Sequence, residues 1–258
     1  MTTDIVDLRA FYLSPLGHAT RRLLRQKLWQ LWPDLRGMNL LALGFATPVL
    51  RPWLTQTKNI FALMPAAQGV VYWPKEGPNR TALTDPLDLP LADNSIDRVL
   101  LLHAMESAED SNALLREIWR VLKSGGRMIT IVPNRRGIWA MSDATPFGAG
   151  QPFSPSQLKN ILRDNSFLPE GVSRALYLPP WQGPLWQKLG GFTERWGAAL
   201  APTMGGVLLA EASKQLYAPI NPARIRQKGL RLQLPIIPQA GSSGLTAPQQ
   251  TTPDTKSF

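Results

Sequence analysis

The stretch 93–134 limits the fold more than any other part of the chain, because it places two apolar runs on either side of an amphipathic segment. Ile96–Leu102 and Met128–Val132 are short and apolar, as strands buried on both faces are. Between them, apolar residues recur at helical spacing, namely Leu114, Leu115, Ile118, Val121 and Leu122. A strand, a helix and a second strand of these lengths require a parallel pair with a right-handed crossover. The sequence therefore predicts an open α/β sheet.

Charge and glycine signals mark the expected ends of this helix. Glu106, Glu109 and Asp110 place negative charge where the helix is expected to begin, which suits the helix dipole. Gly125-Gly126 is expected to stop it, because glycine adopts the left-handed cap conformation without steric cost.

Several further elements are predicted before and after this stretch. An amphipathic helix is expected over 20–32, and short apolar runs predict strands at 39–43, 59–64 and 70–73. Another strand is expected at 175–178. Ser154, Pro155 and Gln157 have the spacing of a capping box at the start of a further helix.

The composition restricts the chemistry. The chain of 258 residues contains no cysteine and two histidines, which excludes thiolate chemistry and predicts no metal site. Its net charge of +10 suggests an anionic partner, such as nucleic acid, a lipid surface or an acidic protein, or else a solvated basic surface. No run approaches the roughly 18–20 apolar residues of a transmembrane helix, and the N-terminus lacks a signal-peptide core, so a cytoplasmic protein is expected.

The first predicted strand leads into a turn, Gly44-Phe45-Ala46-Thr47-Pro48, where open α/β sheets bind nucleotide-like cofactors. Small residues there let the backbone approach a ligand. The turn contains one glycine, and the second strand ends near Leu63 or Met64 without the acid expected to hold a ribose.

The segment LPLADNSIDRVLLLHAMESAEDSNALLREIWRVLKSGGRMITIVPN resembles class I S-adenosylmethionine-dependent methyltransferases of the type 11 family, and LREIWRVLKSGGRM is its most specific part. The similarity covers roughly 40–132. It implies a Rossmann-like α/β fold with a seven-stranded sheet, mostly parallel with an antiparallel last strand, and helices on both faces. The run 206–213 suits that last strand.

The same resemblance implies a site. It assigns S-adenosyl-L-methionine to a set of cofactor-binding positions, namely Gly44, Phe45, Ala46, Asp85, Leu87 and His103. His103 is also the best-placed candidate for a catalytic base, with Glu106 behind it. The sequence departs from the family pattern at the cofactor turn, where Ala46 and Pro48 replace two of three glycines.

The long segment after the last predicted parallel strand borders the acceptor pocket in the resembling enzymes. We therefore expect substrate contacts from Asn134, Arg135, Trp139 and Phe147. Trp139 and Phe147 would face an apolar or planar acceptor, and Arg135 an anionic group. The alternative is a packed loop with a solvated basic pair.

Five regions are expected along the chain. They are a helical segment 1–37 packed on the domain, a methyltransferase-like domain 38–216, a tryptophan-rich insertion 179–202 within it, a basic arm 217–238 and a disordered tail 239–258. Trp181, Trp186 and Trp196 suit a lid, a partner-binding surface, a membrane-interface patch or core packing.

Two functions remain open at this point. The first is methyl transfer from S-adenosylmethionine to a small-molecule or protein acceptor, which depends mainly on proximity and orientation. The second is a catalytically degenerate protein with the same fold that acts as a binding or regulatory partner. Direct nucleic-acid binding ranks last, because it rests on charge alone. Gly44 and Asp85 predict weak cofactor binding, while the sequence specifies neither the acceptor nor the oligomeric state.

Overall fold

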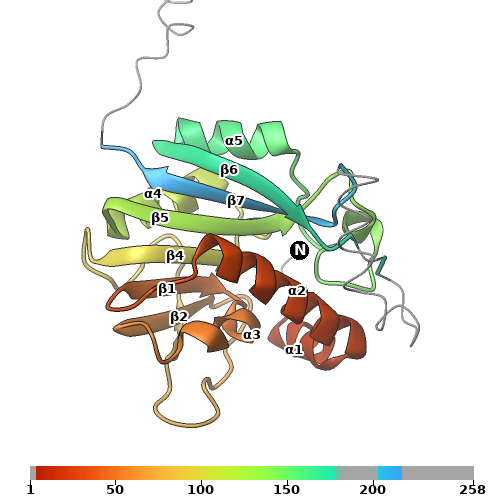
Figure 1. Cartoon of the computed structure of the whole chain (residues 1–258), viewed down its shortest axis with the longest axis horizontal. Coiled ribbons are helices and arrows are strands. Elements are labelled where there is room, and N and C mark those ends of the chain that lie inside the picture. Colours follow the sequence, from red (N-terminus) through yellow and green to blue (C-terminus); the bar gives the residue numbers. More distant parts are fainter. Residues whose placement is uncertain (1–3, 178, 181–202, 217–258) are drawn as a thin grey trace, which may run out of the picture. The chain divides into compact units, whose positions relative to one another are not determined.

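The computed structural model describes residues 4–177, 179–180 and 203–216, and Figure 1 shows the arrangement of their helices and strands. The tryptophan-rich positions 181, 186 and 196, the basic arm and the tail lie outside the described residues.

A seven-stranded sheet forms the centre, with the strand order β3-β2-β1-β4-β5-β7-β6. The strands are β1 Asn39–Gly44, β2 Asn59–Pro65, β3 Thr81–Thr84, β4 Ile96–Leu102, β5 Leu122–Pro133, β6 Phe167–Ala175 and β7 Val207–Lys214. Strands β1 to β5 pair in parallel, and β7 runs antiparallel to both β5 and β6. This topology confirms the predicted Rossmann-like sheet with an antiparallel last strand.

Helices cover both faces of the sheet (Figure 1), as predicted. Alternation along β1 separates the two cores, because successive side chains of a strand point to opposite faces. Leu40 and Ala42 pack with α2 Pro15–Leu31 and α3 Thr47–Leu50. Leu41 and Leu43 pack with α4 Ser111–Val121 and α5 Pro155–Asp164. Two short 3-10 helices, η1 Arg51–Trp53 and η2 Ile138–Met141, complete the set.

Two helices precede the sheet, whereas the sequence analysis expected one. Helix α1 Ile5–Leu13 begins at Asp4, whose carboxylate accepts a hydrogen bond from the Val6 amide. Ser14 ends α1 and is the N-cap of α2, with Pro15 in the first turn. None of the helices in the described part is long and apolar enough to cross a membrane.

Three local predictions are wrong. The segment 70–73 forms no strand, and β3 lies at 81–84, where Thr81 pairs with Ala62 of β2. Helix α4 ends at Val121, before Gly125-Gly126, because Leu122 is already buried and paired with Ile96. The strand expected at 175–178 ends at Ala175.

The ends of α4 and α5 follow local chemistry. Asp110 caps α4 by accepting hydrogen bonds from the amides of Asn112 and Ala113. Glu106, expected in the first turn of this helix, lies before it and is buried. The capping box of α5 between Ser154 and Gln157 is present as predicted.

Arg120 of α4 holds the loop before β4 in place. Its guanidinium donates hydrogen bonds to the carbonyl oxygens of Leu89 and Leu91, and it pairs with Glu117 and Asp93. These carboxylates raise the pKa of Arg120 above its usual range. The strongest family-like motif in the sequence therefore has a structural role in joining loop and helix.

Replacing Arg120 by alanine is expected to lower the free energy of unfolding by about 1–3 kcal/mol, because two loop carbonyls lose a charged donor. Arg116→Ala in the same helix removes an exposed ion pair of 3.8 Å with Asp110 and should cost less than about 0.5 kcal/mol. Urea unfolding of the two variants measures the difference, and equal losses would contradict this role of Arg120.

Candidate functional site

The turn after β1 lies against the end of β4. Gly44 has a φ of 85°, a left-handed conformation that favours glycine. A Cβ at this position would overlap the carbonyl oxygen of Leu102 and lie 3.0 Å from the Cβ of Ala104. Ala46 has a φ of −92°, so its methyl group introduces no such strain. The glycine is therefore required by packing between two strand ends.

Helix α1 packs on the carboxyl ends of β1 and β2. Its Leu8 and Tyr12 form a buried cluster with Phe45, from the turn after β1, and Met64, from the end of β2. All four side chains are less than 5% exposed. The resemblance places the ribose-binding acid near Leu63 or Met64, and both side chains are apolar and buried.

A side chain also crosses the end of β1. Gln68 follows β2 and donates a hydrogen bond of 3.0 Å from its Nε2 to the carbonyl oxygen of His103, which follows β4. Because β1 lies between β2 and β4 in the sheet, this contact spans the edge above β1. Gln68 is 2% exposed. The edge where open α/β sheets bind their ligands is thus covered by protein atoms.

Tyr12, His103 and Glu106 form a buried polar chain. The Tyr12 hydroxyl lies 2.9 Å from His103 Nε2, and His103 Nδ1 lies 3.2 Å from Glu106 Oε1. Among the described residues, both carboxylate oxygens of Glu106 are buried without a hydrogen-bond partner, and the tautomer of His103 decides which group donates between Tyr12 and Nε2. Burial, and then the charge of Glu106, raise the pKa of Tyr12 well above its usual range. Tyr12 is therefore a neutral phenol that shares a hydrogen bond with His103.

His103 itself has a φ of 56°, which is uncommon for a residue with a side chain. The structure brings together the two residues predicted as catalytic, His103 and Glu106, but encloses both, with 3% and 4% of their surfaces exposed. Strained and buried polar groups of this kind occur at functional sites. The group formed by Tyr12, His103 and Glu106 is therefore a candidate site.

The expected acceptor side is also packed against α1. Phe11 contacts Trp139 and Phe147 edge-on, and the ring of Phe147 lies 4.7 Å from that of His103. Trp139 and Phe147 are at most 1% exposed, so both belong to the core.

The remaining predicted substrate residues have other surroundings. Asn134 is buried and donates hydrogen bonds to the carbonyl oxygens of Thr203 and Gly205. Arg135 is exposed and donates a hydrogen bond to the carbonyl oxygen of Pro152.

Two of the predicted cofactor residues, Asp85 and Leu87, are exposed, unlike the buried group that contains His103. Asp85 is exposed, and its Oδ1 accepts a hydrogen bond of 2.8 Å from the Leu87 amide, which closes a turn. Leu87 is 46% exposed. The predicted cofactor residues are therefore divided between a covered edge (Gly44, Phe45, Ala46 and His103) and an exposed turn.

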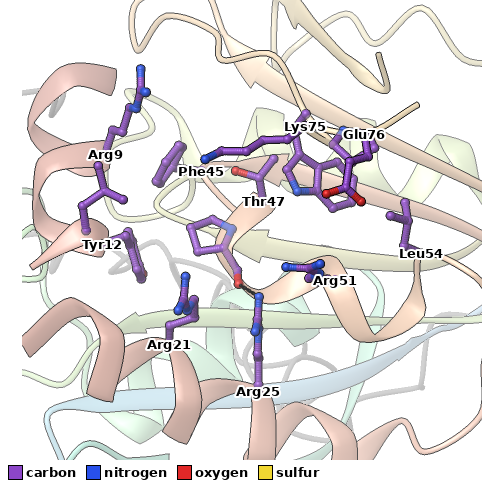
Figure 2. A pocket seen from close by; sticks show the side chains of 14 residues that line it. Arg9, Tyr12, Arg21, Arg25, Phe45, Thr47, Arg51, Leu54, Lys75 and Glu76 are labelled. Carbon is purple, nitrogen blue, oxygen red and sulfur yellow. Dashed lines mark hydrogen bonds between the residues drawn. The ribbon is translucent and has the colours of Figure 1, made fainter. Parts of the chain in front are cut away.

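A cavity of about 340 Å³ opens beside α1 and is rich in cations. Figure 2 shows Arg21 and Arg25 on one side, Lys75 and Glu76 on the other, and Arg51 between them. Among the predicted site residues, Phe45 lines this cavity. Arg25 Nη2 donates a hydrogen bond to the carbonyl oxygen of Pro48.

Tyr12, Gln68 and the cations of the cavity were not predicted from the sequence. One available signal was Asp4 followed by Ile5, Leu8 and Tyr12, an N-cap with apolar residues at helical spacing. No comparable signal marks Gln68, whose contact depends on the strand order.

Comparison with known proteins shows the fold and a partial match to one family model. The family model described as "Methyltransferase domain" matches residues 41–130. No curated protein has a sequence that matches this chain.

Three solved structures are similar at low identity. A methyltransferase of Thermotoga maritima, described as a possible histamine N-methyltransferase, has 17% identity and a TM-score of 0.55, covering 80% of this chain and 94% of its own. A second similar structure is a complex between the Haloferax volcanii Trm112 methyltransferase activator and a protein described as a methyltransferase. Its matching chain has 18% sequence identity and a TM-score of 0.54, and the match covers 77% of this chain and 88% of that one. The [4+2]-cyclase SpnF has 18% sequence identity and a TM-score of 0.52, and the match covers 75% of this chain and 80% of SpnF. At these identities the similarity shows the fold.

Gly44→Ala is expected to lower the free energy of unfolding by about 2–5 kcal/mol, because left-handed strain adds to overlap with Leu102. Gly37→Ala is the matched control, since Gly37 has a φ of 73° but open space around its Cβ position, and it should cost about 1–2 kcal/mol. Chemical denaturation compares the two variants. Equal losses would show that packing against β4 does not require glycine.

Proposed function

We propose that the protein acts as a binding or regulatory partner and not as a methyltransferase, although residues 41–130 match the model of a methyltransferase domain and the sheet has the strand order of class I methyltransferases. The observation that supports this proposal is the covering of the cofactor edge by α1 and Gln68. The same fold does not require methyl transfer, since one solved structure of similar fold is a [4+2]-cyclase.

The residues present at the strand ends do not fit S-adenosylmethionine in this arrangement. A ribose needs a hydrogen-bonding partner at the end of the second strand, and Met64 offers an apolar side chain that is fully buried. Gln68 crosses the edge above β1 through its hydrogen bond to the His103 carbonyl oxygen, and Phe45 is buried in the cluster with α1. Losing one charge-assisted hydrogen bond costs about 1.5–3 kcal/mol, which corresponds to roughly one to two powers of ten in affinity.

The open cavity is also a poor match for this cofactor. S-adenosylmethionine carries a sulfonium and an ammonium against one carboxylate, so it is a net cation. The cavity presents five cationic side chains against Glu76, which would repel a cation. Neither the covered edge nor the cavity therefore supports the cofactor predicted from the resemblance.

A second candidate function is S-adenosylmethionine-dependent methyl transfer after α1 moves away. The family match and the buried chain of Tyr12, His103 and Glu106 favour it. In that case movement of α1 would expose His103 as a base for the acceptor. A protein partner could supply this movement, as one similar fold was solved in complex with a methyltransferase activator.

Calorimetric titration of the purified protein with S-adenosylmethionine and S-adenosylhomocysteine separates the two functions. We expect no binding at about 1 mM ligand, because α1 and Gln68 cover the edge. A dissociation constant of about 10 μM or below, lost in Asp85→Ala, would instead establish a cofactor site and overturn the proposal.

Gln68→Ala provides an internal check on the cause. This substitution removes the side chain that crosses β1 and leaves the amide that bonds to Pro65 unchanged. Binding that appears in Gln68→Ala but is absent in the natural sequence would identify the covering as the barrier. Such binding would favour the second candidate function, in which a cofactor site is present beneath the covering.

A further inference from the structure

We propose that the cavity beside α1 binds a small organic phosphate, whose oxygens contact Arg21 and Arg51 and whose organic part lies on the apolar wall. This inference rests on the proposed binding function and names the class of ligand. The cavity lies between α1, α2, the turn after β1, η1 and the loop at 73–76 (Figure 2).

The charge of the cavity is strongly unbalanced. Its cations are Arg9, Arg21, Arg25, Arg51 and Lys75, and its acid is Glu76. Within the described residues, no carboxylate forms an ion pair with any of these five cations. A net charge of this sign in a concave site concentrates anions.

Two arginines of this cavity come from α2, while Arg9 and Arg51 are exposed at its rim. Arg21 and Arg25 are one helical turn apart on α2, so they point the same way, and both are half-buried. Arg25 Nη2 is fixed on the Pro48 carbonyl, while its Nε is buried with no hydrogen-bond partner. Burial, and then repulsion from Arg21 and Arg51, lower the pKa of Arg25. The guanidinium groups of Arg21 and Arg51 thus both repel that of Arg25.

Such an arrangement costs stability unless an anion compensates it. Like charges at i and i+4 destabilise a helix, and an unpaired buried donor adds to that cost. Phosphate oxygens match guanidinium forks through paired hydrogen bonds and neutralise the charge. A phosphate group is therefore the chemistry that these residues recognise best.

The rest of the lining indicates an organic ligand. Phe45, Leu54 and Trp73 form apolar parts of the wall. A cavity of about 340 Å³ is within the usual size range of small-molecule sites. Because Arg21 and Arg25 converge in a hollow and are half-buried, they suit a compact ligand better than a membrane or an extended nucleic acid.

Calorimetry with sodium pyrophosphate and with ADP, at fixed ionic strength, tests the proposal. We expect a dissociation constant below about 1 mM for pyrophosphate in the natural sequence, and Arg21→Gln or Arg51→Gln should weaken it about tenfold or more. Arg22→Gln is the matched control, because Arg22 is exposed on the same helix and does not line the cavity. Its affinity should stay within about twofold. ADP should bind at least as tightly as pyrophosphate.

The other outcomes overturn the proposal. No binding of either phosphate, or equal weakening by Arg21→Gln and Arg22→Gln, would show that the cavity is not the site. Binding confined to phosphatidylglycerol vesicles or to a single-stranded oligonucleotide would show that these cations bind a membrane or a nucleic acid and not a small phosphate. Circular dichroism confirms that each variant is folded. Titration of the same samples with S-adenosylhomocysteine tests the proposed function separately, because phosphate binding can fail while the cofactor edge remains closed.

Discussion

The hydrogen bond between Tyr12 and His103 joins the first helix to the end of β4, and what the sheet edge can bind depends on this contact. Around it, Leu8 packs with the ends of β1 and β2, while Phe11 packs with Trp139 and Phe147 beyond β5. One short helix therefore packs against residues predicted to bind the cofactor and against residues predicted to bind the acceptor. A helix of nine residues has little stability alone, so this packing must supply it.

This arrangement gives separate roles to two parts of the family-like sequence. The segment 93–134 builds β4, α4 and β5, and Arg120 fastens the preceding loop to α4. The turn at Gly44 keeps its glycine for close packing with Leu102. Residues that resemble a cofactor-binding enzyme can thus be retained because the fold needs them, whatever ligand the protein binds.

The sequence was sufficient to predict the elements whose burial is visible as a pattern of apolar residues. The runs of β1, β2, β4 and β5 were predictable because strands buried on both faces read as continuous apolar stretches. Strand β3 was not, since Ala82 and Leu83 are exposed and the strand has four residues. The apolar run at 70–73 was misleading, because Val71 packs with the α1 cluster and Trp73 lines the cavity, while Val70 and Tyr72 are exposed.

The site was less predictable, because burial and proximity across the sheet have no local signature. Trp139 and Phe147 suit a pocket wall or a core equally well in sequence, and the structure places them in the core. The cations that meet in the cavity come from separate segments of the chain. Their convergence follows from how α1 and α2 pack, which single-sequence patterns do not specify.

Hydrogen–deuterium exchange of α1 tests most directly whether the helix covers the sheet edge. The account predicts that the amides of 8–13 are protected to a degree approaching those of β1 and β4, and that 1 mM S-adenosylhomocysteine leaves this protection unchanged. Exchange of α1 within seconds, or a change in its protection when the ligand is added, would contradict a closed edge.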